Sequence, residues 1–75
     1  MEFAGSARKH GVTEDDALHA IANAISTVQQ DADRVLFLGP DSAGRPLEVV
    51  VLFDEDAEPV VIHADVMRSK FRRYL

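Results

Sequence analysis

The chain has 75 residues, which is enough for one small domain and too few for two. It contains no cysteine, which excludes disulfides and thiolate-bound metals, and its three histidines lack the spacing of a zinc site. The formal net charge of −5 repels nucleic acid on average, so any contact with phosphate requires a local basic patch.

The first third of the chain is predicted to be helical. Residues 2–10 are compatible with a short helix, which Gly11 would end in a left-handed conformation. Thr13 and Asp16 have the spacing of an N-terminal capping box, and acidic residues fill the first turn after it. Apolar residues then recur at helical spacing at Ala17, Leu18, Ile21, Ala22 and Ile25. This pattern predicts a helix over residues 13–24.

Beyond residue 24 the pattern changes to that of β-strands. Apolar and β-branched runs, separated by the turns GPDSAGRP and DEDAEP, predict strands over residues 25–30, 34–39, 47–53 and 60–66. Because short turns join antiparallel neighbours, three or four of these strands should form one antiparallel sheet. Residues 68–75 are predicted to form a C-terminal helix. We therefore expect a single α+β domain over residues 1–75, with N-terminal helices, this sheet and a C-terminal helix, the helices lying on one face.

The segment Leu47–Phe53 is the most continuously apolar of the predicted strands. Such a run is typical of a central strand that is buried on both faces, and we expect it to dominate the core. Glu48 is its one charged residue and is expected at an edge or in solvent. In the last strand, the alternation of side chains would turn His63 to the same face as Val61.

The basic residues are distributed unevenly along the chain. The last eight positions hold four of the eight Arg and Lys residues and no acidic residue, whereas the earlier positions hold all thirteen Asp and Glu residues. On a helix, Arg68 and Arg72 are four residues apart and Lys70 and Arg73 are three apart, so two basic ridges would flank Phe71. These ridges could bind phosphates or carboxylates; alternatively, the cations only complement the helix dipole.

Other polar residues have two interpretations each. His63 ends a hydrophobic strand, where it could act as a general acid or base or be a half-buried histidine bonded to the backbone. Lys9 and His10 could form a phosphate clamp or could simply be the C-terminal cations of a short helix. Arg34 and Arg45 flank a turn and are either further phosphate contacts or ordinary solvated arginines.

The chain lacks the motifs of phosphate-binding loops, zinc metalloproteases and serine hydrolases. Three histidines and eight cations without a metal site leave one reaction class that fits, the metal-free cleavage of RNA. In that reaction the 2′-hydroxyl of the substrate is the nucleophile, so the protein supplies only proton transfer and cationic stabilisation of the phosphorane. No cofactor and no metal are expected.

Three segments, RKHGVTEDDAL, RVLFLGPDSAGRPLEVVVLFD and PVVIHADVMRSKFRRY, resemble the BrnT-like toxins of bacterial toxin–antitoxin systems. The resemblance runs in order over nearly the whole chain. It implies a fold like that of the RelE-type ribonucleases, cleavage of messenger RNA that inhibits translation, and a ribbon-helix-helix antitoxin as partner. The family commonly reads SAR where this chain reads HAD, so His63 stands in place of a serine and Asp65 in place of an arginine. The residues that match the family pattern are Lys9, His10, Arg34, Arg45, Arg68, Arg72 and Tyr74.

Two hypotheses follow from the residues and the resemblance together. The first is a metal-independent endoribonuclease toxin, for which folding must gather the cations on one patch with the carboxylates turned elsewhere. Its expected catalytic residues are His63, Arg45, Arg68 and His10. Its expected RNA-binding residues are Lys9, Arg34, Lys70, Arg72, Arg73 and Tyr74. The second is an inactive module of the same fold that keeps only the surface for an antitoxin or regulator.

The same reasoning gives expectations about assembly and location. A domain this small buries about 60% of its unfolded surface and is marginal without help, which favours a homodimer or a heterotetramer with the antitoxin. No stretch approaches 18 apolar residues, and no charged segment followed by an apolar run opens the sequence. The protein is therefore expected to be soluble, cytoplasmic and free of membrane contact.

Overall fold

A capped helix follows the N-terminal segment, as the sequence predicts. The computed structural model describes residues 1–75, and its one α-helix is α1 (Glu14–Ala22). The hydroxyl of Thr13 accepts a hydrogen bond of 3.1 Å from the amide of Asp16, which satisfies one of the free amides of the first turn. The predicted helix over 13–24 is confirmed; it begins one residue later and ends two residues earlier than predicted. Neither α1 nor the short helices are long and apolar enough to cross a bilayer.

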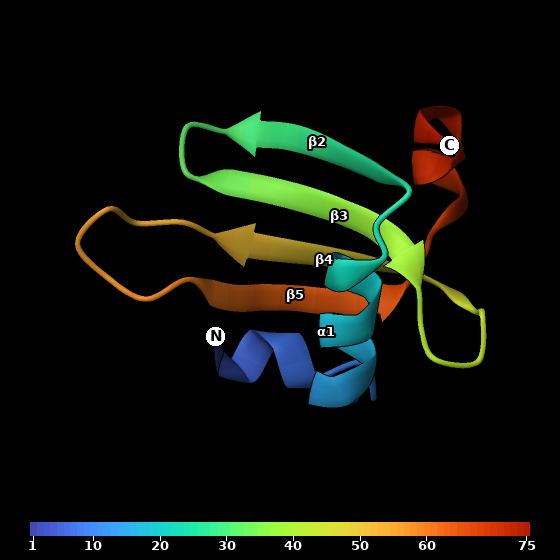
Figure 1. The fold of residues 1–75 in the computed structure, drawn as a ribbon, viewed down its shortest axis with the longest axis horizontal. Helices are drawn as coiled ribbons and strands as arrows, with labels where there is room; N and C mark the ends of the chain where they lie inside the picture. The colour runs from blue at the N-terminus through green and yellow to red at the C-terminus, as the bar shows by residue number, and fades with distance from the viewer.

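Five strands form a single mixed sheet (Figure 1). Their order is β1-β5-β4-β3-β2, and all neighbours are antiparallel except β1 and β5, which are parallel. The strands are β1 (Glu2–Phe3), β2 (Ser26–Asp31), β3 (Arg34–Pro40), β4 (Pro46–Leu52) and β5 (Val60–Val66). The predicted antiparallel meander is confirmed for β2 to β5, with β4 in the centre because its apolar side chains need cover on both faces.

The N-terminal segment differs from its prediction. Residues 2–10 were expected to be one short helix, but the chain first pairs with β5 as β1 and then forms only a 3₁₀ turn, η1 (Gly5–Arg8). The amide of Ala4 donates to the carbonyl of Val61 at 2.9 Å, and the Ser6 hydroxyl donates to the carbonyl of Ile62 at 2.6 Å. The free edge of β5 therefore binds this segment, and the sheet has five strands instead of three or four.

The helix α1 lies on the sheet through small residues. Ala17 and Ala20 are its fully buried side chains, whereas Leu18 and Ile25 of the predicted apolar stripe are 39% and 72% exposed. A Cβ atom at Gly39 of β3 would overlap the carbonyl oxygen of Ala20. The helix backbone therefore approaches the strand too closely for larger side chains, which is why alanines take the buried positions and part of the predicted stripe is wrong.

The two faces of the sheet carry separate apolar clusters. The larger cluster, on the α1 face, consists of Ala7, Val12, Ala17, Ala20, Leu47, Val49, Val51, Val61 and Ala64. On the opposite face, Leu36, Leu38 and Val50 are covered by Phe71 and Tyr74 of the C-terminal 3₁₀ helix η2 (Ser69–Tyr74). Val28, Ile62 and Met67 pack against the same cluster. Figure 1 shows η2 beyond the ends of β2 and β3, away from α1 and η1. The expectation that all helices share one face is therefore wrong for η2.

A β-bulge in β5 changes the direction of His63. Val51 pairs with Val61, but the preceding residue, Val50, pairs with His63, so Ile62 is an extra residue in the register. Val61 consequently faces α1, whereas His63 lies on the opposite face with Val50 and Glu48. The prediction that Val61 and His63 share a face is wrong, because simple alternation does not hold across a bulge.

Candidate acid–base site

A buried carboxylate lies at the centre of the candidate site. Glu48, the third residue of β4, has no exposed surface, although it was expected at an edge or in solvent. Its Oε1 accepts hydrogen bonds from the backbone amide of Arg68 at 2.7 Å and from Nε of Arg68 at 3.0 Å. Its Oε2 accepts from Nη2 of Arg68 at 2.7 Å and lies 3.0 Å from Nε2 of His63. Folding thus brings a carboxylate, a guanidinium and an imidazole into direct contact.

These contacts determine the charge of Glu48. Burial by itself would raise the pKa of this carboxyl group, because it removes water from the charged form. The hydrogen bonds from Arg68 and His63, together with the charge of Arg68, outweigh burial, and the pKa of Glu48 lies below its ordinary value. In return, the hydrogen bond with Glu48 raises the pKa of Arg68. Glu48 is therefore a carboxylate at neutral pH, compensated as a buried charge must be.

The backbone after β5 is what delivers Arg68 to this position. The amide of Met67 donates to the carbonyl of Pro46 at 3.0 Å, so the chain leaves the sheet beside the start of β4. Arg68 is the residue before η2, and its guanidinium lies 5.4 Å from the ring centre of Phe71, which itself packs on the sheet. The C-terminal segment is therefore attached to the sheet both by apolar contact and by Glu48.

A second histidine approaches the first from the N-terminal segment. His10 lies between η1 and α1, and Gly11 after it has φ 77°, a left-handed conformation that suits glycine. The rings of His10 and His63 are 5.5 Å apart between their centres and are inclined at 70°. Nδ1 of His10 lies 3.6 Å from Oδ2 of Asp65, a distance that permits an ion pair when the histidine is protonated. Two histidines, each beside its own carboxylate, therefore lie next to one another.

Solvent can reach the reactive groups of this cluster although its base is buried. The side chains of His10 and His63 are 37% and 26% exposed, and that of Arg68 is 49% exposed. A substrate can therefore contact both imidazoles while the carboxylate of Glu48 stays out of reach beneath them. Such an arrangement can transfer protons in both directions, which is the requirement for general acid–base chemistry.

Of the four residues expected to be catalytic, the structure groups three. His10, His63 and Arg68 belong to the cluster, but Arg45 lies in the turn before β4, where its Nε donates to Asp41 at 3.0 Å. Asp41 is itself buried and also accepts from the amide of Arg45, so this pair holds the turn.

The residues expected to bind RNA are spread more widely. Arg34 opens β3 and pairs with Leu52, at the far end of the hairpin from Pro40 and Pro46. Six residue steps at roughly 3.3 Å place it about 20 Å from that end. Lys9 is exposed beside His10. Folding therefore separates Arg34 from the cluster, and the expectation that all the cations form one patch is wrong.

The C-terminal cations form a group of their own next to the cluster. Lys70, Arg72 and Arg73 are exposed, and none of them makes a salt bridge with a carboxylate. Arg73 lies 5.0 Å from the ring centre of Tyr74 and donates to its hydroxyl at 3.1 Å. Because η2 is a 3₁₀ helix with three residues per turn, Lys70 and Arg73 share a side, while Arg68 and Arg72 do not form the expected four-residue ridge.

Two acidic residues lie inside the site, against the expectation that carboxylates would be turned elsewhere. From the sequence, Asp65 was only a departure from a family pattern, and Glu48 was expected at an edge or in solvent. One signal was present: a lone carboxylate inside an apolar run of seven residues, which as a buried group requires a cationic partner. The identity of that partner, twenty positions away in sequence, could not be read from the pattern.

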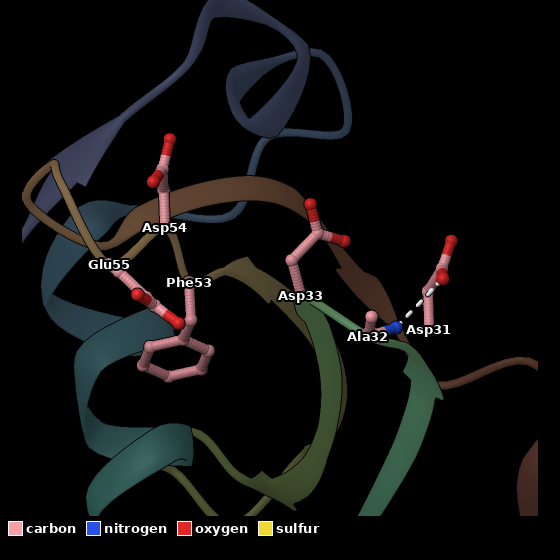
Figure 2. Close-up of a pocket in the computed structure, with 6 residues that line it drawn as sticks. All are labelled: Asp31, Ala32, Asp33, Phe53, Asp54 and Glu55. Carbon is pink, nitrogen blue, oxygen red and sulfur yellow. Dashed lines mark hydrogen bonds between the residues drawn. The ribbon is translucent and has the colours of Figure 1, made fainter.

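The one hollow of the surface lies at the other end of the sheet (Figure 2). It has a volume of about 550 Å³, and its lining residues are Asp31, Ala32, Asp33, Phe53, Asp54 and Glu55. In Figure 2, Glu55 lies beside the ring of Phe53, Asp54 and Asp33 point away from the ring, and Asp31 lies further off. No basic side chain is among the residues that line the hollow. Four negative charges oppose the binding of RNA there, so we place the candidate chemistry at the histidine cluster.

In comparisons with known proteins, no family model matches the chain, and no curated protein or solved structure is significantly similar to it. The resemblance to BrnT-like toxins therefore stays a prediction from the sequence segments. What the structure establishes is an α+β fold with one mixed sheet and one α-helix, in which two histidine–carboxylate pairs meet.

Proposed function

We propose that the chain is a metal-independent endoribonuclease that cleaves messenger RNA, acting as the toxin of a bacterial type II toxin–antitoxin module. The observation that carries the proposal is the pairing of His10 and His63, whose rings are 5.5 Å apart. The proposed setting is the bacterial cytoplasm, and the proposed partner is a ribbon-helix-helix antitoxin, with the chain as a homodimer or in a heterotetramer with that antitoxin.

The proposed reaction needs only what these residues supply. One imidazole takes the proton of a ribose 2′-hydroxyl, and the oxygen attacks the adjacent phosphorus. The bond from phosphorus to the 5′-oxygen breaks, and the other histidine, in its protonated form, gives a proton to that oxygen. The products are a 2′,3′-cyclic phosphate and a free 5′-hydroxyl, so no water, metal or oxidant is consumed in this step.

The cations that can bind the RNA backbone are those that lie near the histidines and have no carboxylate partner, a condition that leaves out Arg34 at the far end of the hairpin. Lys9 beside His10 and the group Lys70, Arg72 and Arg73 on η2 meet this condition. Arg68 does not, because its Nε and Nη2 both donate to Glu48. Backbone binding is therefore assigned to the N-terminal lysine, next to His10, and to the C-terminal group on η2.

The test is cleavage of RNA by the purified chain in the presence of a chelator. Cyclic phosphate ends should appear, and His63→Ala and His10→Ala should each lower the rate about 10²–10⁴-fold, the usual contribution of one acid or base. His19→Asn is the matched control, because Nδ1 of His19 only bonds the carbonyl of Pro40, at 2.9 Å, and an amide can still donate there. Undiminished cleavage in the His63 variant would show that the assigned roles are wrong.

A second function is favoured by one specific observation. The two arginines expected to be catalytic, Arg45 and Arg68, are already neutralised by Asp41 and Glu48. The second function is that of a non-catalytic module, which binds an antitoxin or regulator through the cations of η2. Such a module does not require Arg45 or Arg68 to be free of a carboxylate partner. It predicts a stable complex with that partner and no cyclic phosphate ends from RNA, however much of the purified chain is added.

A further inference from the structure

The deepest polar group of the molecule lies beneath the proposed catalytic histidine. Glu48 is fully buried, and its two oxygens receive the backbone amide, Nε and Nη2 of Arg68 as well as facing Nε2 of His63. Neither the resemblance nor the proposed reaction gives this carboxylate a task. Its position under a histidine, at hydrogen-bonding distance from one named ring nitrogen, suggests one.

We propose that Glu48 is a positioning residue that holds His63 in the tautomer with hydrogen on Nε2, which makes Nδ1 the nitrogen that exchanges a proton with the substrate. The second half of this statement rests on the proposed function, because it assumes that His63 takes part in RNA cleavage. The first half, the tautomer, is a property of the folded protein and holds with or without a substrate.

The hydrogen-bond donors around Glu48 require this tautomer. All three groups of Arg68 can only donate, so both oxygens of Glu48 act as acceptors and no room remains for a carboxyl proton. An ionised carboxylate cannot donate to a bare ring nitrogen 3.0 Å away. Nε2 of His63 must therefore carry the hydrogen and donate it to Oε2. In the neutral ring Nδ1 then has a free lone pair, which is the form a general base requires.

Arg68 acquires a different role in this arrangement. Its guanidinium does not face the proposed phosphate site freely but compensates the charge of Glu48, in contact with the same oxygen, Oε2, that faces His63. The contacts run from Arg68 to Glu48 to His63. Arg68 keeps the carboxylate of Glu48 ionised, and this carboxylate orients the imidazole of His63. Arg68 thus acts through Glu48, as a second positioning residue.

The third histidine provides an internal reference of the opposite kind. Nδ1 of His19 lies 2.9 Å from the carbonyl oxygen of Pro40, which can only accept, so His19 must carry its hydrogen on Nδ1. One spectrum of the native protein therefore contains both tautomers. Two-bond ¹H–¹⁵N correlation spectra in mildly alkaline solution, where imidazole is neutral, assign each ring nitrogen as protonated or bare. We expect Nε2–H for His63 and Nδ1–H for His19.

The variant Glu48→Gln tests the cause. The amide oxygen should keep the place of Oε1, which accepts from both the backbone amide and Nε of Arg68. The NH₂ group then takes the place of Oε2 and donates to Nε2 of His63, which moves the ring hydrogen to Nδ1, while Nη2 of Arg68, on a half-exposed side chain, loses its acceptor and turns to solvent. We expect the tautomer of His63 to invert and RNA cleavage to fall about 10²–10⁴-fold. Asp33→Asn removes the same charge in the acidic hollow and should change neither.

The outcomes separate this inference from the proposed function. Nδ1–H at His63 in the native protein, or an unchanged tautomer in Glu48→Gln, would overturn the inference even if RNA is cleaved. Inversion of the tautomer with full cleavage would overturn the positioning role alone. If Glu48→Gln does not fold, the spectrum of the native protein still decides the tautomer. The variant Arg68→Gln then tests the contacts in place of Glu48→Gln, and an undiminished rate of RNA cleavage in Arg68→Gln would contradict the role of Arg68. Absence of all RNA cleavage with Nε2–H at His63 would contradict the proposed function and leave the tautomer established.

Discussion

Removing the carboxylate of Glu48 should cost much of the stability of this domain. In Glu48→Ala the guanidinium of Arg68 and the Nε2–H of His63 lose their acceptor, together with the link between β4 and the C-terminal segment. Breaking a buried ion pair by removing one partner costs about 3–5 kcal/mol. The side chain of Arg68 is 49% exposed, so water can take over part of its hydrogen bonding. We therefore expect the lower end of that range, about 3 kcal/mol.

Removing the other partner of the pair, Arg68, should cost more stability. Arg68→Ala leaves the carboxylate of Glu48, which has no exposed surface in the native fold, with His63 and the backbone amide of residue 68 as its remaining partners. The expected loss is about 4–5 kcal/mol. Because each single variant leaves an uncompensated charge and the double variant leaves neither, the double variant should be more stable than the sum of the two losses predicts, by about 1–3 kcal/mol.

Urea unfolding of the four proteins measures these quantities. A domain of 75 residues is expected to have roughly 4–11 kcal/mol in total, from about 0.05–0.15 kcal/mol per residue, so Glu48→Ala should remain folded, whereas Arg68→Ala removes at least a third of the total and unfolds a domain at the lower end of the range. Each kcal/mol corresponds to about 4–8 °C in Tm for a domain of this size, and Glu48→Ala should melt about 12–24 °C lower. A loss below about 1 kcal/mol in Glu48→Ala, or additive losses in the double variant, would refute the claim that these residues form a buried pair.

Three further predictions concern pH, packing and salt. Because the pKa of Glu48 is depressed in the folded state, its contribution to stability is complete above the ordinary glutamate pKa of about 4.3 and is lost as the pH falls through the lower folded value. Thermal unfolding at decreasing pH should therefore show a steeper acid-side loss in the native protein than in Glu48→Gln. Gly39→Ala should cost about 1–3 kcal/mol, because its Cβ would displace α1, while Gly5→Ala, which meets no atom within 4 Å, serves as the control in the same unfolding assay. Replacing Lys70 and Arg72 with Gln should weaken RNA binding and reduce the slope of log Kd against log salt by about 1.4, since each contact with a single strand contributes about 0.7; an unchanged slope would show that η2 does not bind phosphate.

The elements predicted from local patterns are largely those of the structure. The capping pair Thr13 and Asp16 marked the start of α1, and the β-branched runs marked four strands, because these signals depend on neighbours within a few residues. β1 was missed because a pair of residues that binds the edge of β5 has no periodicity of its own. The predicted apolar stripe of α1 was partly wrong because the helix backbone lies close to Gly39 of β3, which is far away in sequence. Only small side chains such as alanine fit at the buried positions.

The candidate site was recognised by its residue types but not by its geometry. His10, His63 and Arg68 were named from their positions in the sequence, and the structure places them together. The direction of His63 was predicted wrongly because one extra residue in β5 inverts the face on which the following side chains lie. Bulges have no strong sequence signal, since they are defined by the register between two strands.

Composition, charge and local patterns by themselves determined that this chain is one α+β domain, that no disulfide supports it, and that half of its cations gather in the last eight residues. Only the tertiary structure decided which charges meet. Glu48, a carboxylate expected at an edge or in solvent, is the buried partner of Arg68 and His63, and Arg34, expected at the site, lies at the far end of β3. The physical reason is that a buried charge must find its counter-charge wherever the chain brings one, and strand register settles this over twenty positions of sequence.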